Sequence, residues 1–310
     1  CAFTGGFFDM FEKMVRTQTA KQERTLEEWL RRHDSENPFP ADVSLTKNID
    51  YLGDGKACHR MDLYRPANCA QPLPVLINIH GGGFLLGKKE VNRLFCAQMC
   101  GFGFLVCCLE YPLVPDVDIF QVFQDLTVGI NHVASVAAQY GGDPERMYLC
   151  GDSAGAYLCT YLAAMQNNLS MAQAAHVAQI KPQIKALGLI SGMFYTCKHD
   201  KIGFFLPDSV YGRGWRKHAF FPYTNPENPV LAGCLPPCFL VTAKGDFLRH
   251  YSPPPSRSFA KVLQKNGIET RLLDVDAGKK LPHAFSAMLP ETQEAQNANR
   301  DMAAFLLSHS

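Results

Sequence analysis

The amino-acid sequence predicts an α/β protein, with a mostly parallel, doubly wound sheet, helices on both faces and a helical cap. Three observations support this fold class. Apolar runs of strand length alternate with segments of helical pattern over most of the 310 residues. A hairpin signal precedes the first of these strand–helix units. Two further segments break the alternation, and we expect them to cover one end of the sheet.

The predicted strands are short runs rich in Val, Ile, Leu and Phe. Apolar runs without alternation are typical of parallel strands that are covered on both faces. Ahead of them, two segments flank the sequence Gly-Asp-Gly at 53–55, which indicates an antiparallel hairpin at one edge of the sheet. The predicted strands of the main sheet cover residues 74–80, 102–111, 146–150, 184–191, 238–243 and 270–276.

Helices are predicted between these strands. Two segments do not fit: a charged, helix-prone stretch at 7–32, and a long stretch from 193 to 236 that is rich in aromatic residues, glycine and proline. An insertion of that length between two strands is usually functional, for example a lid. We therefore predict a single domain over residues 1–310 with cap segments at about 1–42 and 193–236. The other predicted helices cover residues 91–100, 119–139, 154–165, 256–266 and 292–308.

Composition and charge exclude several classes of partner. The chain has 30 basic and 29 acidic residues and a formal net charge of +1, so bulk charge indicates no nucleic acid and no anionic membrane surface. No apolar stretch approaches the roughly 20 residues that a membrane-spanning helix needs. No signal-peptide pattern opens the chain. We expect a cytoplasmic protein, and the apolar cap could pair with a second copy as a homodimer.

The twelve cysteines are interpreted as core residues. Several lie inside apolar runs, among them Cys107 and Cys150, and buried cysteine behaves as a small hydrophobic residue. This favours reduced thiols in a cytoplasmic protein. The pairs in CAQMC and CLPPC lack zinc-ligand spacing and partner histidines, so neither a metal nor a cofactor is predicted. Cys1 is expected to be the trimmed start of a longer chain rather than a lipidated first residue.

A serine between two glycines marks the candidate nucleophile. The sequence GDSAG at 151–155 fits the pattern G-x-S-x-G, with an apolar strand before it and a helical pattern after it. Glycines at these positions let the strand and the helix approach closely around a strained turn. The free N–H groups at the start of the helix then face developing negative charge. Ser153 is therefore predicted to be the nucleophile.

Three consecutive glycines follow His80 at the end of an upstream strand. Without side chains, their backbone N–H groups can point into a cleft. An acyl-transfer enzyme needs such donors for the oxyanion, and the loss of one donor typically costs on the order of a hundredfold or more in rate. We predict that the N–H groups of Gly82, Gly83 and Ala154 form the oxyanion hole.

The acid and the base follow the serine in chain order. Asp246 lies in the loop after the strand at 238–243, and His283 lies in the loop after the strand at 270–276. The order Ser, Asp, His is one of the known orders of a catalytic triad. Competing residues fit less well: Asp274 and Asp276 come too early, and His199, His218 and His250 are expected at the surface.

Five motifs carry a resemblance to a known family: HGGGF at 80–84, EYPLVPD at 110–116, GDSAGA at 151–156, GDFL at 245–248 and HAF at 283–285. Their order and spacing resemble the α/β-hydrolases, and within them the hormone-sensitive-lipase-like serine esterases, from about residue 45 to the end. The resemblance implies the α/β-hydrolase fold, a two-part cap, and hydrolysis of carboxylic esters without metal or cofactor. His250 stands where the family tends to have a second carboxylate, which leaves the support of Asp246 open.

These observations predict a serine carboxylesterase that hydrolyses a small-molecule ester with a small to medium acyl group. An amidase or a deacetylase acting on an N-acyl or sugar-acetyl group would use the same triad. A non-catalytic small-molecule-binding protein of this fold would be expected to lack a triad residue or a glycine of the loop, and all are present. A lipase for large substrates usually needs an apolar lid, whereas this cap mixes aromatic and charged residues.

The residues of the predicted cap allow two interpretations. Its aromatic side chains could form a substrate pocket with a basic rim for an acidic group. The favoured interpretation is that they pack the cap while its basic residues face solvent. The aromatic residues are Phe194, Tyr195, Phe204, Phe205, Tyr211, Trp215, Phe220, Phe221 and Tyr223, and the basic ones are Arg213, Arg216 and Lys217.

Overall fold

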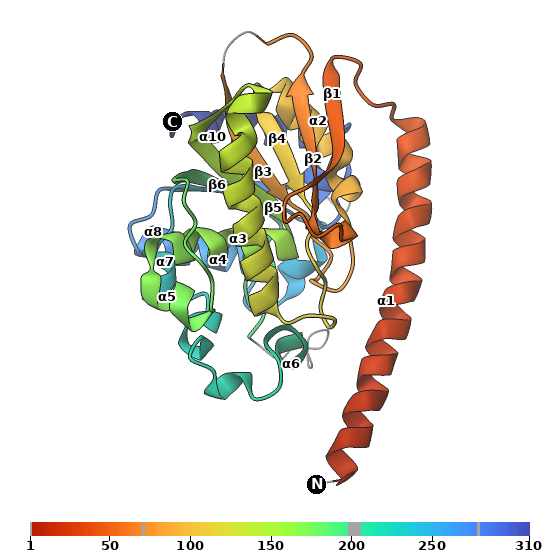
Figure 1. Ribbon diagram of the computed structural model, residues 1–310, viewed down its shortest axis with the longest axis vertical. Coiled ribbons are helices and arrows are strands. Elements are labelled where there is room, and N and C mark those ends of the chain that lie inside the picture. Colours follow the sequence, from red (N-terminus) through yellow and green to blue (C-terminus); the bar gives the residue numbers. More distant parts are fainter. Residues whose placement is uncertain (1, 70–71, 198–205, 278–279) are drawn as a thin grey trace.

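The computed structural model describes residues 2–69, 72–197, 206–277 and 280–310. Within these ranges, eight strands form one sheet in the order β1-β2-β4-β3-β5-β6-β7-β8 (Figure 1). β2 is antiparallel to β1 and to β4, and all other neighbours are parallel. This is the mostly parallel sheet with an antiparallel hairpin at its edge that the sequence predicts. The strands are β1 (Val43–Asp50), β2 (Arg60–Pro66), β3 (Leu73–Ile79), β4 (Leu105–Leu109), β5 (Gly142–Asp152), β6 (Ile184–Ile190), β7 (Cys238–Ala243) and β8 (Thr270–Val275).

Helices cover both faces of the sheet, because successive strand side chains point to opposite faces. In β3, Val75, Ile77 and Ile79 pack into one hydrophobic cluster, and Leu76 packs into the other. The helices are α1 (Ala2–Glu36), α2 (Arg93–Gly101), α3 (Ile119–Val136), α4 (Ala154–Asn167), α5 (Leu169–Ala174), α6 (Leu206–Tyr211), α7 (Pro229–Ala232), α8 (Pro255–Lys265), α9 (Phe285–Met288) and α10 (Gln293–Leu307).

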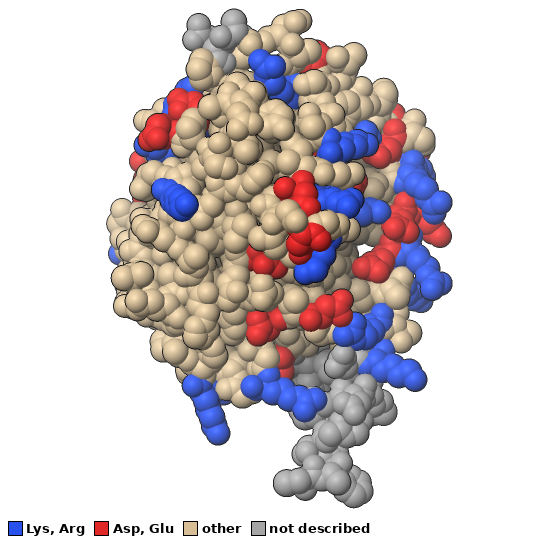
Figure 2. All heavy atoms as spheres, in the orientation of Figure 1, with Lys and Arg blue, Asp and Glu red and all other residues tan. Residues whose placement is uncertain are grey.

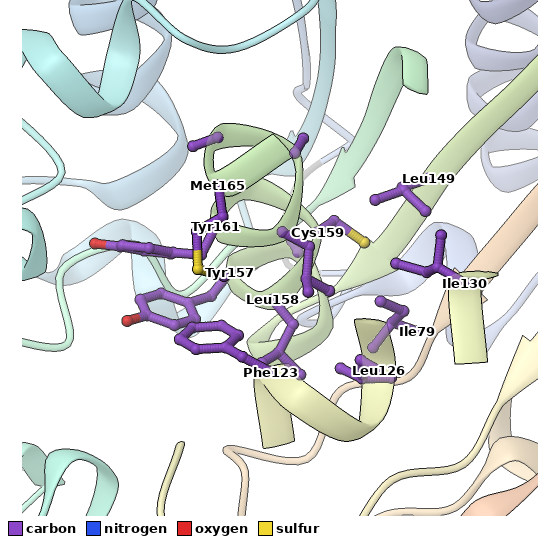
Figure 3. Packing of buried hydrophobic residues seen from close by; sticks show 14 of the residues in the cluster. Ile79, Phe123, Leu126, Ile130, Leu149, Tyr157, Leu158, Cys159, Tyr161 and Met165 are labelled. Carbon is purple, nitrogen blue, oxygen red and sulfur yellow. The ribbon is translucent and has the colours of Figure 1, made fainter. Parts of the chain in front are cut away.

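The larger cluster lies between the sheet, α3 and α4. Figure 3 shows Tyr157, Leu158 and Tyr161 of α4 beside Phe123 of α3, with Ile79 of the sheet close by. All of these side chains are at most 1% exposed. At about 1.5–3 kcal/mol for each large apolar side chain that is fully buried, this cluster is a major source of stability. It also fixes the position of α4, whose first turn follows Ser153.

Helix α1 lies at one side of the α/β body, and its N-terminal part extends beyond the body (Figure 1). Charged side chains of both signs are interspersed on this side of the molecule (Figure 2). Ion pairs join α1 to the body: Arg16 with Asp116 at 2.7 Å, Glu27 with Lys88 at 3.2 Å, and Asp34 with Arg93 at 2.7 Å. The helix is longer than the predicted stretch of 7–32.

The predicted strands and helices are present, but several of their limits were wrong. β4 is shorter than the predicted 102–111, because Gly103 adopts a positive φ of 100° in a turn before the strand. β5 is longer than the predicted 146–150. Helices α5 and α9 were not predicted. Between Met193 and Pro236, the described part contains α6, α7 and short 3-10 turns, while Phe204, Phe205 and His199 lie outside the described residues.

Candidate active site

Ser153 occupies a strained corner between β5 and α4. Its φ of 53° and ψ of −115° lie outside the ordinary regions for a non-glycine residue. The two flanking glycines are required sterically. A Cβ atom on Gly151 would lie 2.6 Å from the Ile79 carbonyl oxygen, and one on Gly155 would lie 2.0 Å from the same oxygen. Backbone hydrogen bonds with Ile190 and Met193 hold the corner against the segment that follows β6.

Asp246 and His283 come together at the carboxyl ends of β7 and β8. The His283 Nδ1–H donates to Asp246 Oδ1 at 2.8 Å, and Asp246 is 1% exposed. His283 Nε2 is buried and has no hydrogen-bond partner among the described residues. Both His283 and Ser153 line the same cavity. The structure therefore brings the three predicted residues to one end of the sheet, with the second imidazole nitrogen open to accept a proton.

The Asp246 carboxylate is held by groups that the sequence did not indicate. Its Oδ1 accepts from the Leu248 N–H at 2.9 Å. Burial raises the pKa of Asp246, but the hydrogen bond and charge of His283, with hydrogen bonds from Ser191 and Leu248, outweigh it and keep the pKa below its ordinary value. The Ser191 hydroxyl also accepts from the Ala284 N–H at 3.1 Å, so this residue links the acid to the loop of the base. His250 is exposed.

The triple-glycine loop lines the same cavity as His283. Gly82 has a φ of 118°, and a Cβ atom there would lie 1.8 Å from the Leu86 carbonyl oxygen. Gly83 has a φ of 62°, and a Cβ atom there would meet nothing within 4 Å. The Gly82 carbonyl accepts from two amides of the same loop, at 3.1 Å each, which closes it into a tight turn.

Asp152, next to the serine, connects the corner to this loop. Its Oδ1 accepts from the Gly81 N–H at 3.0 Å and from Asn92 Nδ2 at 2.8 Å, and the side chain is buried. Asn92 Nδ2 also donates to Asn78 Oδ1 at 3.1 Å. These buried polar contacts join residues up to 71 positions apart, as from Gly81 to Asp152, so no local pattern in the sequence marks them.

A cavity of about 910 Å³ opens above Ser153. Its walls are mostly apolar, and α1 contributes Gln22 and Leu26. No lysine or arginine is among the described residues that line it. The remaining lining residues are Gly81, Gly82, Gly83, Leu85, Leu86, Gly87, Val91, Asp152, Met193, Tyr195, Phe247, Leu248, Tyr251, Ser252, Pro253, Pro255, His283, Ala284 and Met288.

Most aromatic residues of the 193–236 segment pack within the protein rather than around this cavity. Phe194 stacks on Phe259 with ring centroids 4.3 Å apart, and Tyr211 stacks on Trp215 at 5.3 Å. Only Tyr195 of the described members of this set lines the cavity. The basic residues at 213, 216 and 217 are exposed. The interpretation with a basic-rimmed pocket is therefore not supported by the described residues.

Two of the competing site residues have structural contacts of their own. His218 was expected at the surface, but it is half-buried and stacks on Phe120 at 4.3 Å. Asp274 pairs with Arg249 at 2.6 Å and with Arg257. In the described part of the chain, no group of three or more His, Cys, Asp or Glu side chains is placed to hold a metal ion. No helix among the described residues is long and apolar enough to cross a membrane.

Sequence comparisons find similarity to known esterases. The BD-FAE family model matches residues 61–192. A probable isoprenylcysteine alpha-carbonyl methylesterase, ICMEL1 of Arabidopsis thaliana, is 29% identical over 233 residues, covering 69% of this chain and 47% of the relative. The carboxylesterase NlhH of Mycobacterium tuberculosis is 27% identical over 251 residues, covering 78% of this chain and 76% of the relative. The chain spans about half the length of the plant methylesterases that it matches.

Solved structures show the same fold. Esterase B from Lactobacillus rhamnosis superposes with a TM-score of 0.87 at 22% identity, covering 96% of both chains. The thermostable carboxylesterase EstE1, cloned from a metagenomic library, gives a TM-score of 0.71 at 21% identity, covering 94% of this chain and 97% of that one. At this level of identity, the likeness shows the α/β-hydrolase fold.

Proposed function

We propose that this chain, which has the α/β-hydrolase fold, belongs to the hormone-sensitive-lipase-like group and is a serine carboxylesterase. The reaction is hydrolysis of a carboxylic ester through an acyl-enzyme, in the cavity above Ser153. The observation that carries this proposal is the arrangement of His283, which lines the same cavity as Ser153. Asp246 holds one of its ring nitrogens, and the other has no hydrogen-bond partner among the described residues.

In the proposed mechanism, Ser153 Oγ attacks the ester carbonyl carbon while His283 Nε2 takes the hydroxyl proton. The N–H groups of Gly82, Gly83 and Ala154 stabilise the oxyanion. The tetrahedral intermediate collapses, His283 returns the proton to the leaving alcohol, and the acyl group stays on the serine. Water then attacks the acyl-enzyme while His283 Nε2 takes its proton, and His283 returns that proton to Ser153 Oγ as the carboxylic acid leaves. Throughout, Asp246 orients the imidazole and stabilises its cationic form.

The substrate proposed is a neutral ester with a small to medium acyl group. The cavity of about 910 Å³ has mostly apolar walls, which supports an apolar acyl or alcohol group. We also propose that α1 and the segment 193–236 act as the cap, because Gln22, Leu26 and Tyr195 form part of the wall. The absence of lysine and arginine from the described lining residues argues against an acidic substrate.

A reducing compartment, such as the cytoplasm, fits the state of the cysteines. The described cysteines are free thiols, and those at 107, 108 and 150 are buried in the sheet. Burial raises the pKa of the Cys107 thiol to about 12, so it stays in its unreactive protonated form. Homodimer formation remains a prediction.

The test of the proposed function is hydrolysis of p-nitrophenyl esters from acetate to decanoate. We expect turnover by the wild type, and a loss on the order of 10⁵-fold or more in Ser153→Ala. Ser44→Ala, at an exposed position of β1, is the matched control and should hydrolyse at the wild-type rate. A fluorophosphonate should label the wild type and the control but not Ser153→Ala. If Ser153→Ala keeps its turnover, or if the wild type is neither active nor labelled, the proposal is wrong.

A further inference from the structure

His80, at the start of the glycine loop, is a buried histidine whose two ring nitrogens both face acceptors. Its Nδ1 lies 2.8 Å from the Gly81 carbonyl oxygen, and its Nε2 lies 2.8 Å from Glu110 Oε1. A carbonyl oxygen and a carboxylate can only accept. Both nitrogens must therefore donate, and a neutral imidazole has only one N–H. The geometry calls for an imidazolium ring, paired with the Glu110 carboxylate.

The contact with the Gly81 carbonyl bears directly on the oxyanion hole. The Gly81 C=O and the Gly82 N–H belong to one planar trans peptide unit and point in opposite directions. Holding the carbonyl oxygen therefore fixes the direction of the amide. Gly82, with its φ of 118°, has no side chain that could restrict this peptide plane. The His80 Nδ1–H is thus the group that aims the first proposed oxyanion donor.

The Glu110 carboxylate closes the base of the same loop. Oε1 accepts from His80 Nε2, before the loop, and Oε2 accepts from the Lys89 N–H at 3.0 Å, after it. One carboxylate therefore holds both ends of the segment 81–88. Glu110 comes directly after β4, where the ladder with β3 ends, so its position is set by the core of the sheet.

The positively charged ring of His80 is buried among neighbouring side chains. The residue is 1% exposed, its ring stacks on Tyr111 at 4.4 Å, and Tyr111 Oη donates to the His80 carbonyl at 2.8 Å. Asp152 is the second carboxylate that acts on the ring, whereas the Lys89 ammonium pairs with Asp62 and Glu90. Burial lowers the pKa of His80, but the charge and hydrogen bond of Glu110, with the Gly81 hydrogen bond and the Asp152 charge, outweigh it, so the pKa lies above its ordinary value.

We propose that Glu110 and His80 are positioning residues for the reaction: Glu110 keeps His80 protonated, and the imidazolium holds the Gly81–Gly82 peptide plane with its N–H toward the oxyanion. This rests on the proposed esterase function. Since the pKa of folded His80 is raised, the arrangement is complete at low pH and is lost as the pH rises through that pKa. It therefore sets an alkaline limit on kcat.

The test compares Glu110→Gln with the wild type across pH, using p-nitrophenyl acetate. Glutamine keeps the size and removes the charge, so we expect kcat to fall about 10- to 100-fold at neutral pH with little change in KM. The ratio of mutant to wild-type kcat should rise as the pH falls, because acid restores the imidazolium. Any pH dependence that the mutant and the wild type share cancels in this ratio. Glu145→Gln, exposed near the opposite end of β5 from Ser153, is the matched control and should match the wild type at every pH.

A ratio that is constant with pH would show that Glu110 is merely structural, and a ratio of one would show that it has no role. If Glu110→Gln does not fold, ¹⁵N NMR of the wild type decides. The His80 ring, assigned through its contact with Tyr111, should be protonated on both nitrogens at pH 7, and a neutral ring overturns the proposal. If the wild type is active and labelled by a fluorophosphonate but His80 is neutral, only this inference fails. If it is neither active nor labelled, the esterase function fails instead.

Discussion

The floor of the cavity and the helix that forms part of its wall are held in different ways. The floor is defined here by the lining residues Gly81, Gly82, Gly83, Ser153 and His283. It is supported by side chains that are nearly inaccessible to solvent, such as Asp246 and His80, each 1% exposed. Its turns are fixed by close contacts between backbone atoms around Gly151 and Gly155. In α1, by contrast, the buried side chains among those described are Leu30 and His33, both near its C-terminal end.

This difference separates two tasks. Stabilising an oxyanion requires donors that are already in place before the reaction, so the floor must be rigid. A substrate must also enter a cavity that lies partly beneath α1, so this wall can be held more weakly. Substitutions in the floor should therefore lower kcat. Substitutions in α1 should alter KM, substrate range or the opening of the helix.

The largest effect after loss of the triad is expected at Gly82. In Gly82→Ala, the new Cβ atom would lie 1.8 Å from the Leu86 carbonyl oxygen, at a φ of 118° that alanine does not adopt readily. The loop must shift, and kcat for p-nitrophenyl acetate should fall on the order of a hundredfold or more. Gly83→Ala is the matched control. Its Cβ would meet nothing within 4 Å, and the strain at a φ of 62° costs about 1–2 kcal/mol.

We expect Gly83→Ala to lose at most about tenfold in kcat, since the loop keeps its shape. Equal losses of kcat in both variants would contradict the idea that close packing around Gly82 holds the loop in its active shape. Thermal unfolding should be recorded for both proteins, so that a general loss of the fold is not mistaken for a loss of the oxyanion donors.

A smaller and more selective effect is expected at Leu26 of α1. This half-buried side chain lines the cavity, and Leu26→Ala removes apolar contact without touching the floor. For p-nitrophenyl decanoate, kcat/KM should fall about 5- to 10-fold, which corresponds to about 1–1.4 kcal/mol of lost apolar contact. Hydrolysis of the acetate should not change. Leu307→Ala, at an exposed position near the end of α10, controls for surface leucines. An equal loss for both esters would place Leu26 in the floor rather than in the wall.

The contrast between the buried floor and the exposed helix α1 also explains which elements the sequence could predict. The strands of the floor were predicted well, because a parallel strand covered on both faces must be apolar throughout its length, as in β3 and β7. The ends of a strand were less predictable where a turn depends on a single backbone angle, as at Gly103 before β4. The length of α1 was underestimated, because most of its described side chains face solvent and little apolar periodicity marks the helix.

At the site, the sequence predicted the residues that share a known order: Ser153, Asp246 and His283. It did not predict Glu110 or Ser191, although both make buried hydrogen bonds there. Each bonds to a residue at least 21 positions away, so the contact exists only in the folded chain. A carboxylate at the end of an apolar run, as Glu110 is in FLVCCLEY, was the one signal that could have marked such a residue.

The smallest effect is expected from substitutions in the ion pairs that attach α1 to the body, measured as hydrogen exchange of the α1 amides. Arg16 pairs with Asp116 where both side chains are exposed, 47% and 71%, and such a pair contributes about 0–1 kcal/mol. Arg93 pairs with Asp34 at 17% and 34% exposure, and its guanidinium also lies 5.3 Å from the Phe39 ring centre.

Hydrogen exchange of the α1 amides should therefore quicken about two- to threefold in Arg16→Gln, and the difference should vanish at high salt. In Arg93→Gln the increase in exchange rate should be larger and should persist at high salt, because the lost contacts are partly buried. If both variants exchange alike, the two ends of α1 are attached equally, and substrate entry cannot favour its N-terminal part.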